Sequence, residues 1–232
     1  KDRVFEDVVP VLTQGFIENI DEQIDPGDRE QLDLIYSATL LLLYRLFFLL
    51  YAESRGLVAV GDTSEYRYYS LHKLKNDIYE AFKNQRSLHS ERTRWWDALR
   101  NDLFRIIQEG DSSLAVPQYN GGLFHPEALG DPDLKPAAEF LENHKIADRL
   151  LGQALMLLTR DVDANDDYAR KQFIDFRDLG VRHLGSVYEG LLEFKLNIAD
   201  SYIQAAHKGD KPIWRKVDAP EKADKEPGDP YL

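Results

Sequence analysis

The residues of this chain that come closest to a catalytic set are Asp178 and the triplet Glu193-Phe194-Lys195. A metal-dependent nuclease of the broad restriction-enzyme type uses an acidic residue and then Glu-x-Lys on an adjoining strand. The carboxylates hold the metal ion, and the lysine polarises the water or the phosphate. The apolar residues before the triplet have helical spacing, not strand spacing: Leu184, Tyr188, Leu191 and Leu192. On a helix Glu193 and Lys195 would point to different sides, so the residue types fit this chemistry but the predicted element does not.

An acidic run from Asp161 to Asp167 could supply oxygen ligands at alternate positions, as the start of a calcium-binding loop does. Such a loop also needs glycine at its sixth position and glutamate at its twelfth, where this chain has Asp166 and Gln172. An acidic loop between two helices, with capping residues, explains the run better.

The other signatures of catalysis are missing from the sequence. The six histidines have no zinc-binding spacing, and there is no His-Glu-x-x-His pair, serine nucleophile elbow or Gly-rich phosphate loop. Asn120-Gly121-Gly122 is typical of a tight turn and not of a nucleotide site. We therefore predict no catalytic, metal-binding or cofactor-binding residue in this chain.

Basic residues gather between Lys73 and Arg105, where eight Lys/Arg stand against five Asp/Glu in a chain whose net charge is -12. The acidic total argues against non-specific nucleic-acid binding by the whole surface, but a local group of cations can still contact phosphates, in a manner sensitive to salt and blind to base sequence. The candidates, called the basic stripe below, are Lys73, Lys75, Lys83, Arg86, Arg92 and Arg94. The alternative is a solvated helical hairpin with Trp95 and Trp96 in the core.

The elements that must position these residues are predicted to be helices, because apolar residues recur at helical spacing in five segments: 4–20, 29–56, 70–82, 93–108 and 136–159. Ser70 is a predicted N-cap and Gly56 a predicted C-cap. The most apolar run, from Ala38 to Ala52, has fifteen residues with an arginine near its centre. A membrane span needs about 20 apolar residues, so we expect a central helix surrounded by other helices and no membrane partner.

The last 24 residues, from Gly209, contain four prolines, mixed charges and few aliphatic side chains. They are typical of an irregular arm, although residues 213–217 could form one short strand. The predicted fold is therefore all-α: an irregular multi-helix bundle over residues 1–208, with an extended C-terminal arm over 209–232. The chain has no cysteine, no secretory signal and no starting methionine, which indicates a cytoplasmic protein and a piece of a longer chain.

Three stretches, taken in order, resemble one family. "LLLYRLFFLLYAESRGL" (41–57) is similar to its long central helix and "YNGGLF" (119–124) to its tight turn. "DFRDLGVRHLGSVYEGLLEFKL" (175–196) resembles a segment that precedes the catalytic domain. The family is that of large adenine-specific DNA methyltransferases, which includes the Eco57I-like type IIG restriction–modification enzymes and the BREX-type phage-defence methyltransferases. The methylation subunits of type I restriction systems carry a related Leu-Gly-x-x-Tyr-Glu stretch, matched here by residues 184–189.

The resemblance implies a prokaryotic parent enzyme that methylates adenine N6 with S-adenosylmethionine after flipping the base. It implies double-stranded DNA as a partner, and Mg²⁺ only if a nuclease domain is attached. The family's Tyr-Tyr-Thr-Pro and Asn-Pro-Pro-Tyr/Phe motifs do not occur here. The expected function is therefore that of a non-catalytic helical connector that spaces the catalytic domains and contacts the DNA backbone. The alternatives are a free-standing helical module that binds a basic partner and, third, an independent hydrolase.

The glycines of the third stretch have two explanations. Glycine within a helix is destabilising by about 1 kcal/mol relative to alanine, so Gly185 and Gly190 could each admit a close neighbour, one from the connector and one from the methyltransferase domain. Alternatively, Gly180 and Gly185 lie in a turn before the helix begins. The expected contacts with the adjoining methyltransferase domain come from Arg182, His183, Gly185, Glu189 and Gly190.

Overall fold

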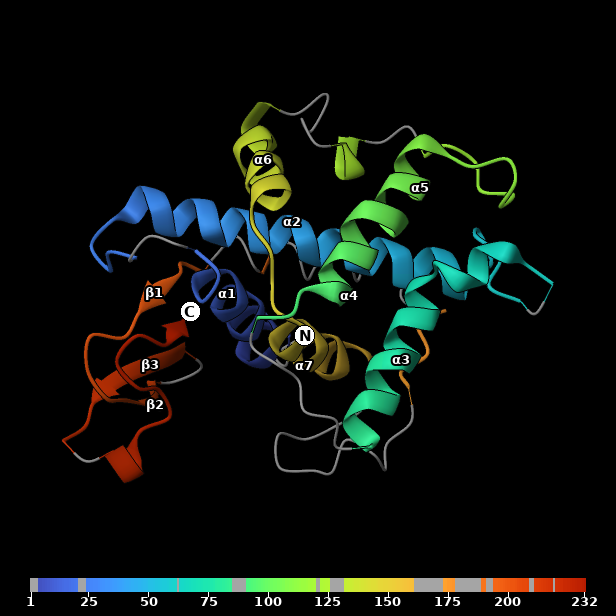
Figure 1. Ribbon diagram of the computed structural model, residues 1–232. Coiled ribbons are helices and arrows are strands. Elements are labelled where there is room, and N and C mark those ends of the chain that lie inside the picture. The colour runs from blue at the N-terminus through green and yellow to red at the C-terminus, as the bar shows by residue number, and fades with distance from the viewer. Residues whose placement is uncertain are drawn as a thin grey trace.

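A computed structural model describes residues 4–20, 24–61, 63–84, 91–119, 122–125, 132–160, 173–177, 189–190, 194–208, 211–218 and 220–232. Helices make up most of the described part, and two small antiparallel sheets follow them near the C-terminus (Figure 1).

Helix α2 (Arg29–Ser54) is the central element and crosses the whole helical body (Figure 1). It begins after Asp28, whose carboxylate accepts a hydrogen bond from the backbone N–H of Gln31 at 3.0 Å. It ends before Gly56, whose φ of 68° is one that glycine adopts without strain. The predicted helix and its predicted ends are confirmed.

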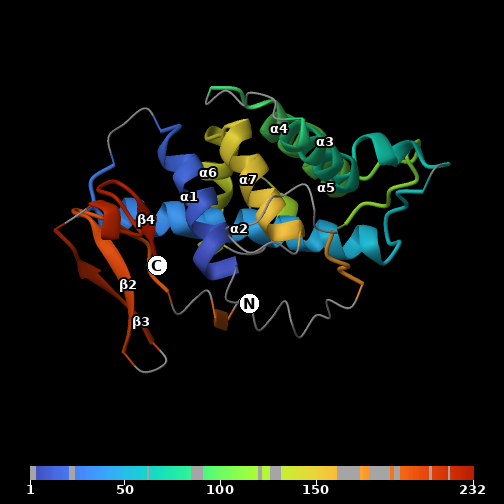
Figure 2. The same ribbon diagram turned by 90° about the horizontal axis from the view of Figure 1, so that it is seen from below.

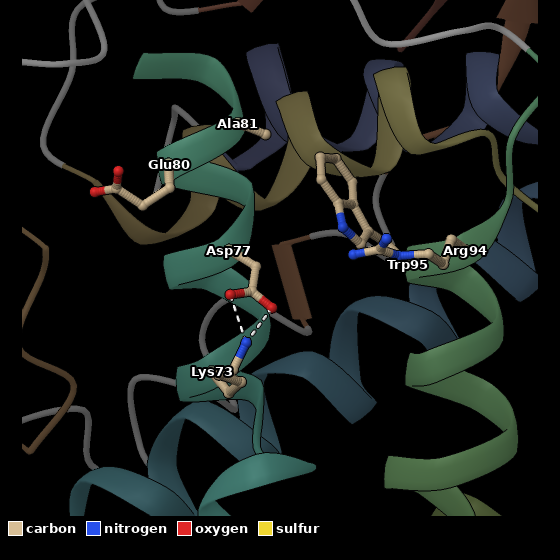
Figure 3. A pocket seen from close by; sticks show the side chains of 6 residues that line it. All are labelled: Lys73, Asp77, Glu80, Ala81, Arg94 and Trp95. Carbon is tan, nitrogen blue, oxygen red and sulfur yellow. Dashed lines mark hydrogen bonds and ion pairs between the residues drawn. The ribbon is translucent and has the colours of Figure 1, made fainter. Parts of the chain in front are cut away.

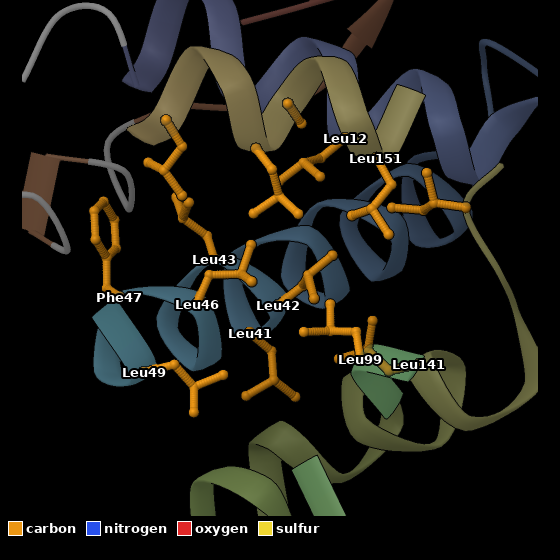
Figure 4. Close-up of a cluster of buried hydrophobic side chains, with 14 of the residues drawn as sticks. Leu12, Leu41, Leu42, Leu43, Leu46, Phe47, Leu49, Leu99, Leu141 and Leu151 are labelled. Atoms are coloured by element: carbon orange, nitrogen blue, oxygen red, sulfur yellow. The ribbon is translucent and has the colours of Figure 1, made fainter. Parts of the chain in front are cut away.

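Leucines leave α2 in several directions and meet side chains of different helices (Figure 4). Leu42, Leu43 and Leu46 are at most 1% exposed and belong to one core cluster that includes side chains of α1, η3, α6 and α7. By length and composition alone α2 could cross a membrane, but 72% of its most apolar window is buried within the protein. Such burial is that of a core helix, because an element that is apolar all round must be covered all round.

Most of the other helical elements follow the predicted segments, and three short 3-10 turns lie between those segments. In chain order, these elements are η1 (Val4–Val8), α1 (Val9–Ile17), η2 (Glu65–Tyr68), α3 (Leu71–Lys83), α4 (Arg94–Asp97), η3 (Ala98–Phe104), α5 (Arg105–Glu109), η4 (Gly122–Phe124), η5 (Pro132–Leu134), α6 (Lys135–Asn143) and α7 (Asp148–Thr159). The single segment predicted over 136–159 is two helices, because the backbone is extended at His144 and Ala147. This break lets Ile146 pack against Gly15 of α1, where a side chain larger than hydrogen would collide with it.

The C-terminal part contains β1 (Asn197–Ile198), β2 (Ile203–Lys208), β3 (Lys211–Lys216), η7 (Pro220–Lys222) and β4 (Pro230–Tyr231). Strand β2 pairs with β3, and β1 pairs with β4, both antiparallel. The prediction of an all-α fold with an irregular arm is therefore wrong: the fold mixes helices with two small sheets. The missed signal is that two six-residue strands are joined by only Gly209-Asp210, a dipeptide typical of hairpin turns.

The C-terminal strands, with the segments between and after them (residues 197–232, called the β unit below), are attached to the helical body. Arg29, at the start of α2, donates from Nη2 to the carbonyl of Leu196 at 3.0 Å and from Nη1 to Oδ1 of Asn197 at 3.2 Å. Within the unit the indole N–H of Trp214 donates to the carbonyl of Leu232 at 3.0 Å. The expected domain boundary between residues 208 and 209 falls between β2 and β3, which pair with each other.

Candidate nucleic-acid interface

The basic stripe is divided between helix α3 and the segment before α4. Lys73, Lys75 and Lys83 lie on α3, whereas Arg92 and Arg94 lie where the chain enters α4. Arg86 lies outside the described residues. Helix α3 begins as predicted, because Ser70 Oγ accepts a hydrogen bond from the backbone N–H of Lys73 at 3.1 Å.

Two lysines of the basic stripe are paired with carboxylates of their own helix. Lys73 Nζ donates to Oδ1 of Asp77 at 2.5 Å, and Lys83 Nζ lies 3.9 Å from Oε1 of Glu80. Such exposed pairs contribute only about 0–1 kcal/mol to stability, but each carboxylate cancels much of the charge that a phosphate would meet. Lys73 and Lys83 are therefore weaker candidates for contacts with DNA phosphates than the sequence indicated.

Lys75 faces a different environment from its neighbours on the helix. Its Nζ lies 4.6 Å from the ring centroid of Phe173, and burial lowers its pKa while Glu53 and Asp175 raise it. Arg160 lies over the same ring at 4.7 Å and over Tyr79 at 4.1 Å. Lys75 therefore belongs to a cluster of cations and aromatic rings that joins α3 to the end of α7.

Arg92 and Arg94 are the exposed cations of the basic stripe for which the described residues supply no ion pair. Their backbone is fixed by Asp148, the first residue of α7. The N–H of Asp148 donates to the carbonyl of Arg92 at 2.6 Å, and Oδ1 of Asp148 accepts from the N–H of Trp95 at 2.8 Å. Asp148 is 7% exposed, and burial raises its pKa against the opposing effects of the Trp95 bond and the two arginines. The backbone that bears the two cations is thus hydrogen-bonded to the start of α7.

A cleft of about 360 Å³ lies between α3 and α4. Figure 3 shows the Lys73–Asp77 pair on one side of it and Arg94 beside Trp95 on the other. Its lining residues are Lys73, Asp77, Glu80, Ala81, Arg94 and Trp95. The two cations and two carboxylates balance, so the cleft itself is not suited to an anion. Because Lys73 is paired with Asp77, a phosphate contact falls instead to the exposed Arg94, which lines the cleft, and to Arg92 two residues before it.

Of the residues expected to meet a methyltransferase domain, only two are described. Glu189 and Gly190 have helical backbone; Glu189 is exposed and Gly190 is buried. Arg182, His183 and Gly185 lie outside the described residues, as do Asp178 and Glu193 of the nuclease-like set and the acidic run 161–167. Among the described residues, no three His, Cys, Asp or Glu side chains are grouped to hold a metal ion.

Two buried charges on α2 were not singled out from the sequence. Glu53, 8% exposed, accepts hydrogen bonds from the Tyr66 hydroxyl at 2.9 Å and from the N–H groups of Leu71 and His72 at 2.7 and 2.8 Å. It thus caps the first turn of α3 from another helix, just as Asp148 caps α4. Arg45, 1% exposed, donates from Nε to the carbonyl of Leu123 at 2.7 Å, and burial lowers its pKa to about 10.

The contacts of Arg45 and Glu53 connect helical elements, so these two side chains have structural roles. The guanidinium carbon of Arg45 lies 5.2 Å from the ring centroid of Phe104 and 5.9 Å from that of Phe124, so the side chain joins α2 to η3 and η4. A lone Arg and a lone Glu within an apolar run are the signals that could have identified them. No protein-family model, curated protein or solved structure matches the chain.

Proposed function

We propose that this chain is a non-catalytic, mainly helical connector of a cytoplasmic, prokaryotic DNA adenine-N6 methyltransferase. In this proposal it spaces the catalytic domains of the intact enzyme, which uses S-adenosylmethionine, and contacts the DNA backbone. The observation that carries the proposal is that α2 is held at each of its ends by a different part of the molecule.

A spacing element has to be long and stiff. With 26 residues, α2 is about 39 Å long, and its middle is buried on several sides. At its start, Arg29 holds the β unit; at its end, Glu53 holds the first turn of α3. A displacement at one end would therefore be carried to the other as a rigid body, which supports a positioning role.

The DNA contact is assigned to Arg92 and Arg94. Both are exposed, and the bonds to Asp148 fix the backbone that bears them. Fixing this backbone before binding reduces the conformational entropy lost on contact with a phosphate. Such contacts would strengthen binding to any DNA sequence and leave base recognition to another domain.

The first test is the reading frame beyond Leu232, where a Tyr-Tyr-Thr-Pro stretch supports the proposal and a stop codon contradicts it.

The second test is the variant Arg92→Ala/Arg94→Ala of the intact enzyme, which should bind DNA several-fold more weakly with an unchanged recognition sequence. The slope of log K against log salt concentration should become smaller by about 1.8, because two phosphate contacts are lost. The matched control is Arg105→Ala/Lys222→Ala, which removes the same charge from exposed positions elsewhere. An affinity at low salt that equals the control's contradicts the DNA contact.

The second candidate is a free-standing module whose acidic surface binds a basic partner. The net charge of -12 favours it. It differs in its test, because the chain alone would then bind a basic protein in a salt-sensitive manner, and Arg92→Ala/Arg94→Ala would strengthen that binding.

A further inference from the structure

Three of the four large apolar side chains that are exposed among the described residues lie in one short segment. They are Leu57, Tyr68 and Tyr69, with exposed fractions of 50%, 55% and 45%, and are called the tyrosine patch below; the fourth is Ile174, at 36%. The segment connects α2 to α3 and projects at one end of the molecule in both ribbon views, where it is cyan to teal (Figures 1 and 2). Single exposed apolar residues are ordinary, whereas a group of them marks a contact surface.

The backbone that carries the tyrosine patch is fixed by hydrogen bonds. The N–H of Leu57 donates to the carbonyl of Ala52 at 2.9 Å, and the N–H of Tyr69 donates to the carbonyl of Tyr66 at 2.9 Å. Tyr66 has no exposure, and its hydroxyl donates to Glu53 of α2 at 2.9 Å. Both parts of the patch are therefore anchored on the same end of α2. Their side chains are exposed on ordered backbone, so less conformational entropy is lost when a partner covers them.

The segment that bears the patch is neutral within an acidic protein. Residues 55–69 contain two Arg, one Asp and one Glu, against a net charge of -12 for the whole chain. Arg55 and Glu65 are exposed, and the described residues supply no ion pair to either. Arg67 donates to the hydroxyl of Tyr68 at 2.6 Å and lies 4.7 Å from the centroid of its ring. The patch thus combines flat aromatic surface with one cation and one anion at its borders.

We propose that the tyrosine patch is a twofold interface through which two copies of this chain associate. Two molecules of net charge -12 repel each other, and a neutral segment is where they can approach with the least repulsion. In a twofold interface each contact occurs twice, because both copies contribute the same surface. Arg55 of one copy would therefore meet Glu65 of the other at two places, on either side of the tyrosines. Tyrosine and arginine are also the residue types that are enriched in protein interfaces.

Other partners fit the patch less well. If the patch bound a different surface of a second copy, the contact would leave an unused patch on each assembly and would extend into filaments. A single-stranded nucleic acid can stack on exposed rings, but it also needs an excess of cations along the surface. Residues 55–69 have no such excess. A contact of the patch with itself satisfies both the apolar side chains and the charges.

Sedimentation velocity of the 232-residue chain at loading concentrations from about 1 to 200 µM tests the proposal, because weak interfaces have a Kd in the micromolar range. The chain has a mass of 26.8 kDa, and its average mass should rise with concentration toward twice that value. The variant Tyr68→Ser/Tyr69→Ser should raise the Kd at least about ten-fold, because aromatic side chains at the centre of an interface carry most of its binding energy. Circular dichroism checks that the variant is folded.

An exchange of charges tests the twofold geometry itself. Arg55→Glu and Glu65→Arg each bring like charges together at two places in a dimer, so each should weaken association. In an equal mixture of these two variants, both contacts again join opposite charges, and a heterodimer should form. A variant that had merely lost its fold would not be rescued by the other. The control is Arg105→Glu, at an exposed position outside the patch, which should associate as the unaltered chain does.

An unaltered chain that stays monomeric at the highest concentration overturns the proposal, and a different protein would then be the partner of the patch. Association that is unchanged in Tyr68→Ser/Tyr69→Ser also overturns it, as does a mixture of Arg55→Glu and Glu65→Arg that associates no better than either variant alone. These measurements contain no DNA and leave Arg92 and Arg94 unaltered. Their failure therefore leaves the DNA contact under the proposed function untouched.

Discussion

The helical body and the β unit are held together by different forces. In the body, leucines of α2 with no measurable exposure meet side chains from several helices, and apolar burial fixes their arrangement. In the β unit, strands β2 and β3 contact each other far more than any helix. The bonds of Arg29 and the partly buried side chains of Ile198 and Leu232 connect the unit to the helical body. The body is also acidic with paired lysines, whereas residues 203–216, which form the β2–β3 hairpin, are basic in sequence. The comparison indicates that apolar packing fixes the helical body, whereas the β unit is held by fewer buried side chains.

The largest expected effect separates the two regions by stability. Leu46→Ala removes a side chain that is 1% exposed at the centre of the body, so the free energy of unfolding should fall by about 2–5 kcal/mol. Ile213→Ala removes a half-buried side chain of the hairpin and should lower it by less than about 1.5 kcal/mol. Urea unfolding followed by circular dichroism measures both. Equal losses would remove the distinction between a packed body and a lightly covered unit.

The second effect concerns the charge that links α2 to α3. Burial raises the pKa of Glu53, and the bonds from Tyr66, Leu71 and His72 oppose this rise. Since the pKa in the folded protein lies above that of the unfolded chain, about 4.3, the folded state keeps the proton to higher pH. Stability should therefore fall as pH rises from the unfolded pKa through the folded pKa, by about 1.4 kcal/mol for each unit of the difference, and stay level above it.

Glu53→Gln tests this pH dependence, because its side chain cannot ionise. The fall in unfolding free energy between pH 4 and the folded pKa should be absent in this variant, as measured by urea titrations at intervals of half a pH unit. The exposed Glu109→Gln is the control and should follow the unaltered chain. Parallel curves for Glu53→Gln and the unaltered chain would contradict an elevated pKa at this position.

The same contrast explains which features could be predicted from sequence. Apolar periodicity located α2 and the helices around it, and the caps at Asp28 and Ser70 follow from local chemistry. The hairpin was missed because its strands are short and their alternation weak, so that Gly209-Asp210 was the stronger signal. The roles of Glu53 and Asp148 depend on which helix end comes near them in space, and no local pattern contains that information. For the same reason the basic stripe could be recognised as a group, but the sequence could not show that Lys73 and Lys83 are paired with carboxylates of their own helix.

The smallest expected effect on stability tests the attachment itself. Arg29 is half-exposed and holds Leu196 and Asn197 through its two terminal nitrogens, so Arg29→Ala should lower the free energy of unfolding by less than about 1 kcal/mol. Leu196 is itself buried in the core, so the unit should loosen without separating. Amide hydrogen exchange at residues 197–206 should then become faster, while exchange within α2 is unchanged, because local opening needs less free energy than global unfolding.

The control variant is Arg29→Lys, which keeps the positive charge but loses the forked pair of N–H donors, and it should act like Arg29→Ala. If Arg29→Lys behaves as the unaltered chain, a single ammonium donor is enough for the attachment. If exchange at residues 197–206 does not change in either variant, the β unit is held by its apolar contacts and α2 does not fix it through Arg29.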